Sequence, residues 1–278
     1  MSDSGKASRY APGWRHRFHV GSYEVDPSGG ARLASLFNYL QEAAGGHAEH
    51  LDLGYHALRS QANLGFVLSR VAVEVNRLPR WDDSVLVVTW PKRAEKLLAL
   101  RDFVVLPDDG SVEDSYGPVD QETLERYAAG DTPLVRATTA WLLIDTDRMR
   151  PVRPERNLAH VPINPGLDSI AQVPERILVP DKPATSEQTR ITRYSDIDQN
   201  DHVNNARYVE WLTDFLAASA MPTAEHSLPA PRDLLINFTG EVKLGDQVEI
   251  RGREDSDGVV TVWLTRDRET SAVARFRF

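Results

Sequence analysis

Residues 197–203 are Ile-Asp-Gln-Asn-Asp-His-Val, and they align without a gap with residues 25–31, which are Val-Asp-Pro-Ser-Gly-Gly-Ala. Each heptapeptide precedes a stretch with apolar residues at helical spacing, and in this alignment Leu40 falls on Leu212. Sequence identity between the two regions is low, so the evidence is the shared pattern. We interpret it as one structural unit that occurs twice in the chain.

The two copies share the order of their predicted elements. Each begins with a strand, passes through the turn into a helix, and continues with stretches rich in Val, Leu, Phe and Trp that are typical of strands. The first copy has a strand at 14–23, a helix at 31–49 and strands at 64–76, 84–91, 97–106 and 134–145; the second has a strand at 188–194, a helix at 204–220 and strands at 234–242, 247–253, 259–266 and 272–278. This order predicts an α+β fold in which a sheet covers the apolar face of each helix. We expect the two sheets to pair edge to edge around a common core.

Composition shifts divide the chain into four predicted parts. They are a disordered lead-in at 1–12, a first unit at 13–147, a Pro-rich linker at 148–184 and a second unit at 185–278. Within the first unit, the acidic segment at 107–131 is expected to be an inserted surface loop with one helical turn.

The overall composition excludes several classes of function. The chain has no Cys, which rules out disulfides, thiolate nucleophiles and Cys-ligated metals. A formal net charge of −9 argues against nucleic acid as a partner, because binding phosphates needs a basic surface. No apolar run is long enough to span a bilayer. We therefore expect a cytoplasmic protein without a membrane or nucleic-acid partner, and we expect neither a metal nor another cofactor.

The second turn concentrates polar side chains at the predicted start of a helix. The first N–H groups of a helix have no partner within it and carry partial positive charge, so they stabilise an oxyanion such as the one that forms on a thioester carbonyl. Losing one such donor typically costs about 100- to 1000-fold in rate. The alternative is that Asp198, Asn200 and Asn204 only cap the helix and that His202 is structural.

The first copy of the turn distinguishes between these interpretations. It is built with Asp26, Ser28 and Gly30, so the fold itself requires neither an imidazole nor an amide there. We therefore predict that the second copy carries the chemistry.

The second turn and its helix also match a known signature, through Asp198, Asn200, His202, Val203, Asn204, Asn205, Tyr208 and Trp211. This stretch resembles the Asp-x-Asn-x-His-Val-Asn-Asn-x-x-Tyr-x-x-Trp motif of the acyl–acyl-carrier-protein (acyl-ACP) thioesterases of plants and bacteria, with every position filled. Residues 76–82 and 89–91 also resemble the first part of that family. The resemblance implies a tandem (double) hotdog fold, each half a long helix wrapped by an antiparallel sheet. In this family the second half supplies the active-site residues and the first supplies much of the acyl pocket.

The resemblance implies catalytic roles for Asp198, Asn200 and His202, and for a Glu after the next strand, which here is Glu241. Plant members commonly have Cys after this Glu, but this chain has Val242, so a Cys–His mechanism is excluded. We expect Glu241 to act as a general base on water or, less favoured, as a nucleophile that forms an anhydride. Asn200 and the N–H groups at the helix start would hold the carbonyl oxygen. His202 would orient water or substrate and protonate the leaving thiolate, while Asp198 orients His202 or Asn200.

Glu241 also has a simpler interpretation. It stands beside Lys243 at a strand end, where a solvated or paired charge is ordinary. In the first copy Arg77 occupies roughly this place, so the fold does not demand Glu there.

The acyl chain needs an apolar site, and the first half is expected to provide it. Candidate substrate-binding residues are the motif amides Asn204 and Asn205 and the apolar residues Phe37, Leu40, Phe66, Leu68 and Trp90. The alternative is that these apolar residues only form the core.

The expected partner is acyl carrier protein bearing a fatty acyl thioester. Because that protein is acidic, docking on this acidic chain would need a local basic patch. Two candidate clusters are Lys92, Arg93, Lys96 and Arg101, and Arg148, Arg150, Arg153 and Arg156, although both are also compatible with ordinary solvated surface. The oligomeric state stays open, because the duplication already supplies the pairing that single hotdog units obtain by dimerising.

The predicted function is hydrolysis of fatty acyl-ACP to free fatty acid and holo-ACP, which terminates fatty acid synthesis. The alternatives are an acyl-CoA thioesterase of the same fold, a dehydratase of hydroxyacyl thioesters and a non-catalytic acyl-thioester sensor.

Overall fold

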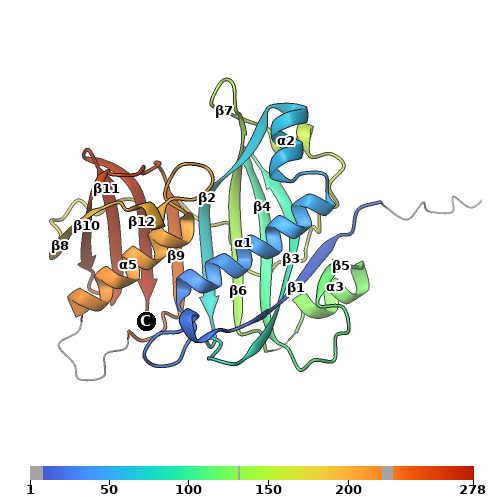
Figure 1. Cartoon of the computed structure of the whole chain (residues 1–278), viewed down its shortest axis with the longest axis horizontal. Helices are drawn as coiled ribbons and strands as arrows, with labels where there is room; N and C mark the ends of the chain where they lie inside the picture. Colours follow the sequence, from blue (N-terminus) through green and yellow to red (C-terminus); the bar gives the residue numbers. More distant parts are fainter. Residues whose placement is uncertain (1–8, 131, 221–227) are drawn as a thin grey trace, which may run out of the picture.

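The computed structural model describes residues 9–130, 132–220 and 228–278, which form one large antiparallel sheet with two long helices, α1 and α5, lying on one of its faces (Figure 1). The strand order is β5-β1-β3-β4-β6-β2-β9-β12-β11-β10-β8, and β7 pairs with β6. Among the described residues, no helix is long and apolar enough to cross a membrane.

The first half holds most of the smaller elements. In chain order it contains β1 (Gly13–His19), η1 (Ser22–Glu24), α1 (Leu33–His50), α2 (Tyr55–Ala62), β2 (Leu64–Val75), β3 (Ser84–Glu95), β4 (Leu98–Pro107), β5 (Tyr116–Val119), α3 (Gln121–Ala128) and β6 (Val135–Asp145), followed by β7 (Arg150–Val152) and α4 (Pro154–Asn157) in the linker. The second half contains β8 (Ser186–Ile191), η2 (Tyr194–Asp196), α5 (Asn205–Ala220), β9 (Asp233–Phe238), β10 (Gln247–Glu254), β11 (Val259–Arg266) and β12 (Glu269–Arg277).

The two halves join where β2 pairs with β9, with Arg70 opposite Asn237 and Glu74 opposite Asp233. From this pair outward the order is β2-β6-β4-β3-β1 on one side and β9-β12-β11-β10-β8 on the other, so each half repeats the other. Helices α1 and α5 contact each other over the junction (Figure 1). The expected edge-to-edge pairing of two sheets is confirmed.

One apolar core runs beneath both helices. Leu36 of α1 and Leu212 of α5 are fully buried in it, together with Val71 from β2 and Ile236 from β9. Burying one such side chain contributes about 1.5–3 kcal/mol. Because the core is continuous across the junction, the two halves share much of their stabilisation.

The first half is more structured than the sequence predicted. The acidic segment at 107–131 contains β5, which extends the sheet beyond β1, and the helix α3, which Asp120 caps by accepting from the Thr123 N–H at 2.8 Å. Of the lead-in expected to be disordered at 1–12, residues 1–8 lie outside the described residues. The described remainder is packed, since the Ala11 N–H donates to His50 Nε2 at 3.0 Å. The domain limits themselves stay predictions.

Candidate active site

The predicted catalytic turn lies between η2 and α5, and hydrogen bonds close it. The Asp198 N–H donates to the His202 carbonyl oxygen at 3.0 Å, and the Val203 N–H donates to the Val242 carbonyl oxygen at 2.8 Å. Asp201 has a φ of 64°, in the left-handed region, which reverses the chain within a few residues. The turn therefore delivers the chain into α5 and anchors it to the loop that follows β9.

The first half builds the same turn with the same hydrogen bond. There the Asp26 N–H donates to the Gly30 carbonyl oxygen at 2.8 Å. Ser28 stands in the place of Asn200, and Gly30 stands in the place of His202. The gap-free alignment of the two turns is thus confirmed at the level of backbone hydrogen bonds, and neither Asn200 nor His202 is needed to form the turn.

Asp198 organises the side chains of the second turn. Its Oδ1 accepts from the Asn200 N–H at 2.8 Å and lies 3.9 Å from His202 Nδ1, while its Oδ2 accepts from Asn204 Nδ2 at 3.3 Å. Asn204 caps α5, because its Oδ1 accepts from the Ala206 N–H at 2.9 Å. The capping interpretation therefore holds for Asn204, while the His202 side chain remains partly exposed, at 32%, and lies within ion-pair distance of the Asp198 carboxylate.

Several hydrogen-bond donors in the described residues of the turn and of the helix start are unused. Within the described residues, the Asn205 N–H at the start of α5 and the exposed side-chain amide of Asn200 have no acceptor. Donors of this kind can bind a carbonyl oxygen as negative charge develops on it.

Glu241 lies next to this turn along the backbone. Val203 follows His202 in the chain, and Val242 follows Glu241. The hydrogen bond between Val203 and Val242 therefore places the backbones of His202 and Glu241 close to each other. Tyr208 of α5 fixes the same loop by donating its hydroxyl to the Gly240 carbonyl oxygen at 3.2 Å. The Glu241 side chain is exposed, and in the described part of the chain no ion pair or hydrogen bond joins it to His202. The structure thus brings the two segments together but does not bring the two side chains into contact.

The counterpart of Glu241 in the first half is Leu78, not Arg77 as expected. The Ala31 N–H donates to the Pro79 carbonyl oxygen at 2.7 Å, in the way that Val203 donates to the residue after Glu241. Leu78 is partly buried and packs against the core. The position therefore accepts an apolar side chain, and the carboxylate of Glu241 is specific to the second half.

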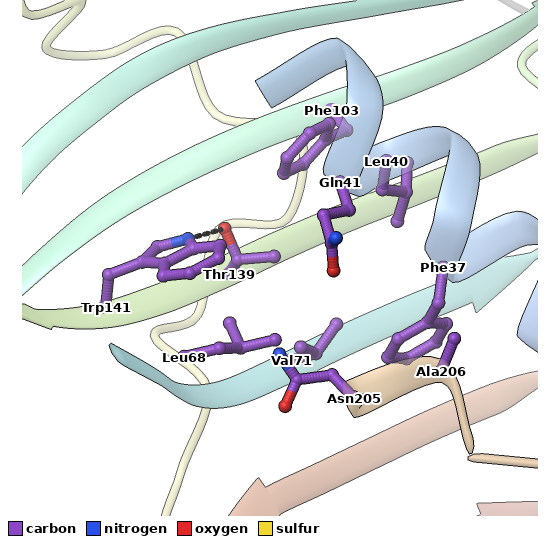
Figure 2. Close-up of a pocket in the computed structure, with 10 residues that line it drawn as sticks. All are labelled: Phe37, Leu40, Gln41, Leu68, Val71, Phe103, Thr139, Trp141, Asn205 and Ala206. Carbon is purple, nitrogen blue, oxygen red and sulfur yellow. Dashed lines mark hydrogen bonds between the residues drawn. The ribbon is translucent and has the colours of Figure 1, made fainter. Parts of the chain in front are cut away.

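An apolar cavity opens beside the start of α5 (Figure 2). It is lined by Phe37, Leu40 and Gln41 from α1, Leu68 and Val71 from β2, Phe103 from β4, Thr139 and Trp141 from β6, and Asn205 and Ala206 from α5. Its free volume of about 20 Å³ holds about one water molecule, so an acyl chain would have to displace side chains on entering.

The structure places four of the predicted pocket residues, Phe37, Leu40, Leu68 and Asn205, around this cavity. Phe66 does not line it but contacts Trp141 edge to face, with ring centroids 6.3 Å apart.

The prediction that Trp90 lines the acyl pocket is wrong. It points to the opposite face of the sheet, where it packs with Val88 and Leu124 and its Nε1–H donates to the Leu167 carbonyl oxygen at 3.0 Å. The reason is the alternation of side chains along β3, which sends Val87 towards α1 and Trp90 away from it.

A comparison of the two halves shows why the cavity is in the first one. The repeated turn and strand registers place Ala43 in the position of Phe215, and Thr139 in the position of Phe276. In the second half both rings are buried, and Phe215 packs so closely that a Cβ on Gly252 would lie 2.4 Å from it. The first half has a methyl group and a hydroxyl where the second has two phenyl rings.

Six lining residues were missing from the sequence-based set, namely Gln41, Val71, Phe103, Thr139, Trp141 and Ala206. The alternation of Thr139 and Trp141 along one strand was a usable signal for a shared face. The strand register that sets them opposite α1 was not visible in the sequence.

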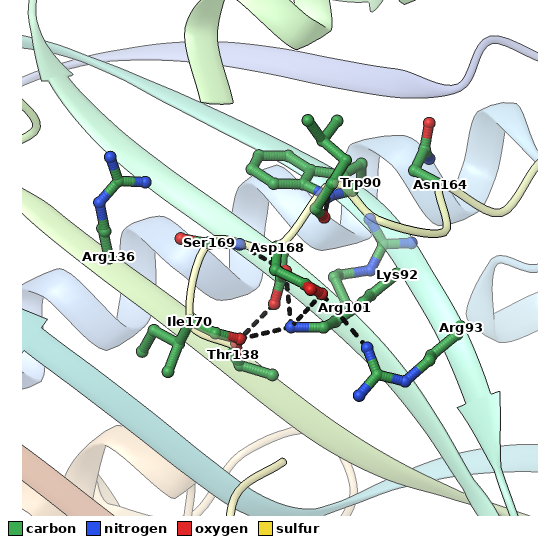
Figure 3. Close-up of polar contacts among 12 residues, drawn as sticks. Trp90, Lys92, Arg93, Arg101, Arg136, Thr138, Asn164, Asp168, Ser169 and Ile170 are labelled. Carbon is green, nitrogen blue, oxygen red and sulfur yellow. Dashed lines mark hydrogen bonds and ion pairs between the residues drawn. The ribbon is translucent and has the colours of Figure 1, made fainter. Parts of the chain in front are cut away.

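The outer face of the cavity wall carries a buried ionic cluster (Figure 3). Lys92 Nζ lies 3.1 Å from Asp102 Oδ2 and 2.8 Å from Asp168 Oδ1, and the Lys92 and Asp102 side chains are fully buried. Asp102 also accepts from the Ser169 N–H at 2.8 Å and from the Thr138 hydroxyl. The hydrogen bond from Lys92 holds the pKa of the Asp168 carboxyl below its usual range, whereas burial raises the pKa of Asp102. The cluster ties the linker to β3, β4 and β6.

This arrangement contradicts the prediction that Lys92, Arg93, Lys96 and Arg101 form a docking cluster for the carrier. Lys92 is buried, Arg93 pairs with Asp168 at 3.2 Å, and Arg101 points towards α1, where burial lowers its pKa to about 10. These side chains, with Lys96, do not form one basic surface. By contrast, the other cluster at 148–156 is exposed.

Comparison with known proteins agrees with this architecture. Two family models, described as the N-terminal and the C-terminal domain of acyl-ACP thioesterases, match residues 13–117 and 181–275. A palmitoyl-acyl carrier protein thioesterase of Gossypium hirsutum is 30% identical over 224 residues, covering 77% of this chain and 49% of that protein. The chain spans about half the length of the curated relatives it matches.

Solved structures show the same fold. An acyl-ACP thioesterase from Bacteroides thetaiotaomicron superposes with a TM-score of 0.77 at 23% identity, covering 95% of this chain and 96% of the other. The 12:0-ACP thioesterase from Umbellularia californica gives a TM-score of 0.76 at 20% identity, covering 96% and 97%. The α+β tandem hotdog architecture is thereby confirmed. Because the two family models together match more than half of its residues, the chain belongs to the acyl-ACP thioesterase family.

Proposed function

We propose that this protein hydrolyses fatty acyl-ACP to a free fatty acid and holo-ACP. The observation that carries the proposal is the difference between the two turns. The second holds Asn200 and His202 on the turn that leads into α5, where Asn205 and Ala206 line the apolar cavity, whereas the first holds Ser28 and Gly30 on a turn closed by the equivalent backbone hydrogen bond. Family membership supports the same reaction.

In the proposed mechanism the thioester carbonyl lies at the start of α5. Its oxygen accepts from the unused donors, the Asn205 N–H and the Asn200 amide, which stabilise the tetrahedral intermediate. Glu241 takes a proton from the attacking water, and His202, oriented by Asp198, protonates the leaving thiolate. Catalytic hydrogen bonds often shorten only when substrate is bound. The exposed Glu241 side chain is therefore proposed to move within hydrogen-bond distance of the attacking water in the substrate complex.

The carrier is proposed to dock on the remaining basic cluster, Arg148, Arg150, Arg153 and Arg156. Strand β7 carries part of it and pairs with β6 at Leu143, two residues beyond the cavity-lining Trp141. The cluster thus lies at the same end of β6 as the cavity. Reversing the charge of Arg150 and Arg153 together should weaken the salt dependence of acyl-ACP hydrolysis. An unchanged salt dependence would remove the cluster from consideration.

The test of the function is a thiol-release assay on acyl-ACP and acyl-CoA with the same acyl groups. The proposal predicts release of one thiol and one fatty acid per turnover, with a higher kcat/KM for acyl-ACP. A preference for acyl-CoA would support the acyl-CoA hydrolase instead. Water elimination without thiol release would identify a dehydratase, and ligand binding without turnover would identify a sensor.

A further inference from the structure

The wall of the acyl cavity continues into a polar region centred on Arg101. Arg101 on β4 lies opposite Thr139 on β6, and the Thr139 hydroxyl donates to the Arg101 carbonyl oxygen at 3.3 Å. Thr139 and Phe103, which share this wall, are both cavity-lining residues. Arg101 is therefore the next residue along β4 on the inner face, beyond the end of the cavity.

The guanidinium of Arg101 has no anionic partner in the described part of the chain. Its Nη1 donates to His47 Nδ1 at 3.1 Å and to Thr89 Oγ1 at 3.2 Å. His47 Nε2 donates to the Ala11 carbonyl oxygen at 3.1 Å, so this ring is neutral, and burial lowers its pKa well below the usual value. The Arg101 side chain is partly exposed, and its unpartnered nitrogens are not among the fully buried ones, so a cation paired only with neutral groups here is open to an anionic ligand.

Three of the five N–H donors of Arg101 are left over. A guanidinium offers one donor on Nε and two on each Nη. Both Nη1 donors are used, but the described residues offer no acceptor to Nε or Nη2. Those two nitrogens form one edge of the guanidinium, the edge that binds a carboxylate through two parallel hydrogen bonds.

The fold does not require these polar groups. The strand registers place Val260 in the position of Arg101, Phe276 in the position of Thr139 and Gly252 in the position of Thr89. All three counterparts in the second half are apolar. The first half thus replaces a filled apolar region with a cation that has an unused bidentate edge.

We infer that Arg101 binds a carboxylate at the far end of the acyl chain, so that acyl thioesters of dicarboxylic acids are substrates. The inference rests on the proposed hydrolase function and specifies its acyl group. The thioester lies at Asn200 and His202, the methylene chain occupies the apolar cavity, and the terminal carboxylate pairs with Nε and Nη2 of Arg101. A chain that ends in a methyl group would leave that edge of the guanidinium unpaired and dehydrated.

The test compares thioesters of equal carbon number that end in a methyl group or in a carboxylate, on the same carrier. The wild-type protein should favour the carboxylate by at least about tenfold in kcat/KM, since a charge-assisted bidentate contact is gained. Arg101→Gln and Arg101→Met should abolish the preference. Arg101→Lys should keep part of it, and covers the case in which the neutral variants do not fold.

Arg136 provides the matched control. It is a half-buried strand arginine whose acceptors, among the described residues, are the carbonyl oxygens of Ala128 and Gly130, and Figure 3 shows it apart from Arg101. Arg136→Met should leave the preference unchanged. Equal kcat/KM for the two wild-type substrates, or a preference that survives in Arg101→Met, would overturn the inference. If neither thioester releases thiol, the hydrolase proposal fails, and calorimetric binding of the free mono- and dicarboxylic acids still decides the role of Arg101.

Discussion

Replacing Lys92 with Met should destabilise the protein by about 3–4 kcal/mol at pH 7. The substitution leaves Asp102 fully buried with two neutral donors and no cation. The least costly response is for Asp102 to take up a proton. For a carboxyl with an ordinary pKa of 3.8, protonation at pH 7 costs about 4 kcal/mol, at about 1.4 kcal/mol per pH unit.

The same reasoning gives the pH dependence of the penalty. At pH 5 the protonation cost falls to below about 2 kcal/mol, so the difference between wild type and Lys92→Met should shrink by about half or more. Adding Asp102→Asn to Lys92→Met should recover much of the loss, because the buried charge is then absent. Urea unfolding at pH 7 and pH 5 measures both effects. A penalty under about 1 kcal/mol at pH 7, or one that does not change with pH, would refute the idea that this ion pair holds the linker on the sheet.

The other predictions concern the site and its surroundings. Glu241→Gln should lower kcat by about 100-fold or more, because the proposed general base is lost. The free energy of unfolding should shift by less than about 0.5 kcal/mol, because the side chain is exposed. Thiol release and urea unfolding measure the two values, and a kcat within about threefold of wild type would exclude Glu241 as the base. Leu68→Trp should reduce the acyl cavity, so kcat/KM for long acyl chains should fall more than for short ones, and an equal fall for all lengths would argue against this cavity as the acyl site. Burial depresses the pKa of His47, so this neutral imidazole contributes stability above its unfolded pKa of 6.5 that is lost as pH falls. Below pH 6.5 the free energy of unfolding should therefore decline less steeply in His47→Gln than in wild type, by up to about 1.4 kcal/mol per pH unit, and equal slopes in the two proteins would contradict that.

Local signals in the sequence were sufficient to predict the repeated unit. The turn residues and the helical spacing after them placed the two helices to within two residues, at Leu33–His50 and Asn205–Ala220. These signals are short-range, since turn formation and helix periodicity depend on neighbouring residues. The edge-to-edge pairing of the two sheets was expected because each helix needs a sheet to cover it, whereas the junction between β2 and β9 was not predicted.

The parts that could not be predicted depend on long-range contacts. Lys92 and Arg101 were predicted as candidates for a basic docking surface, because nothing in the sequence around Lys92 signals that Asp168 will fold over it. The orientation of Trp90 depends on which face of β3 meets α1, a choice that alternation alone leaves undetermined. Likewise, the correspondence of Leu78, rather than Arg77, to Glu241 rests on the backbone hydrogen bond from Ala31 to Pro79, two residues that are distant in the chain.

The central claim is that the two halves share a backbone but only the second performs chemistry. It is tested most directly by kcat on acyl-ACP for Asn200→Ala and for its first-half counterpart, Ser28→Ala. We predict that Asn200→Ala loses about 100- to 1000-fold in kcat with wild-type unfolding behaviour, because an oxyanion donor is removed. Ser28→Ala should stay within about twofold. Equal effects of the two substitutions, or full activity in Asn200→Ala, would contradict the account.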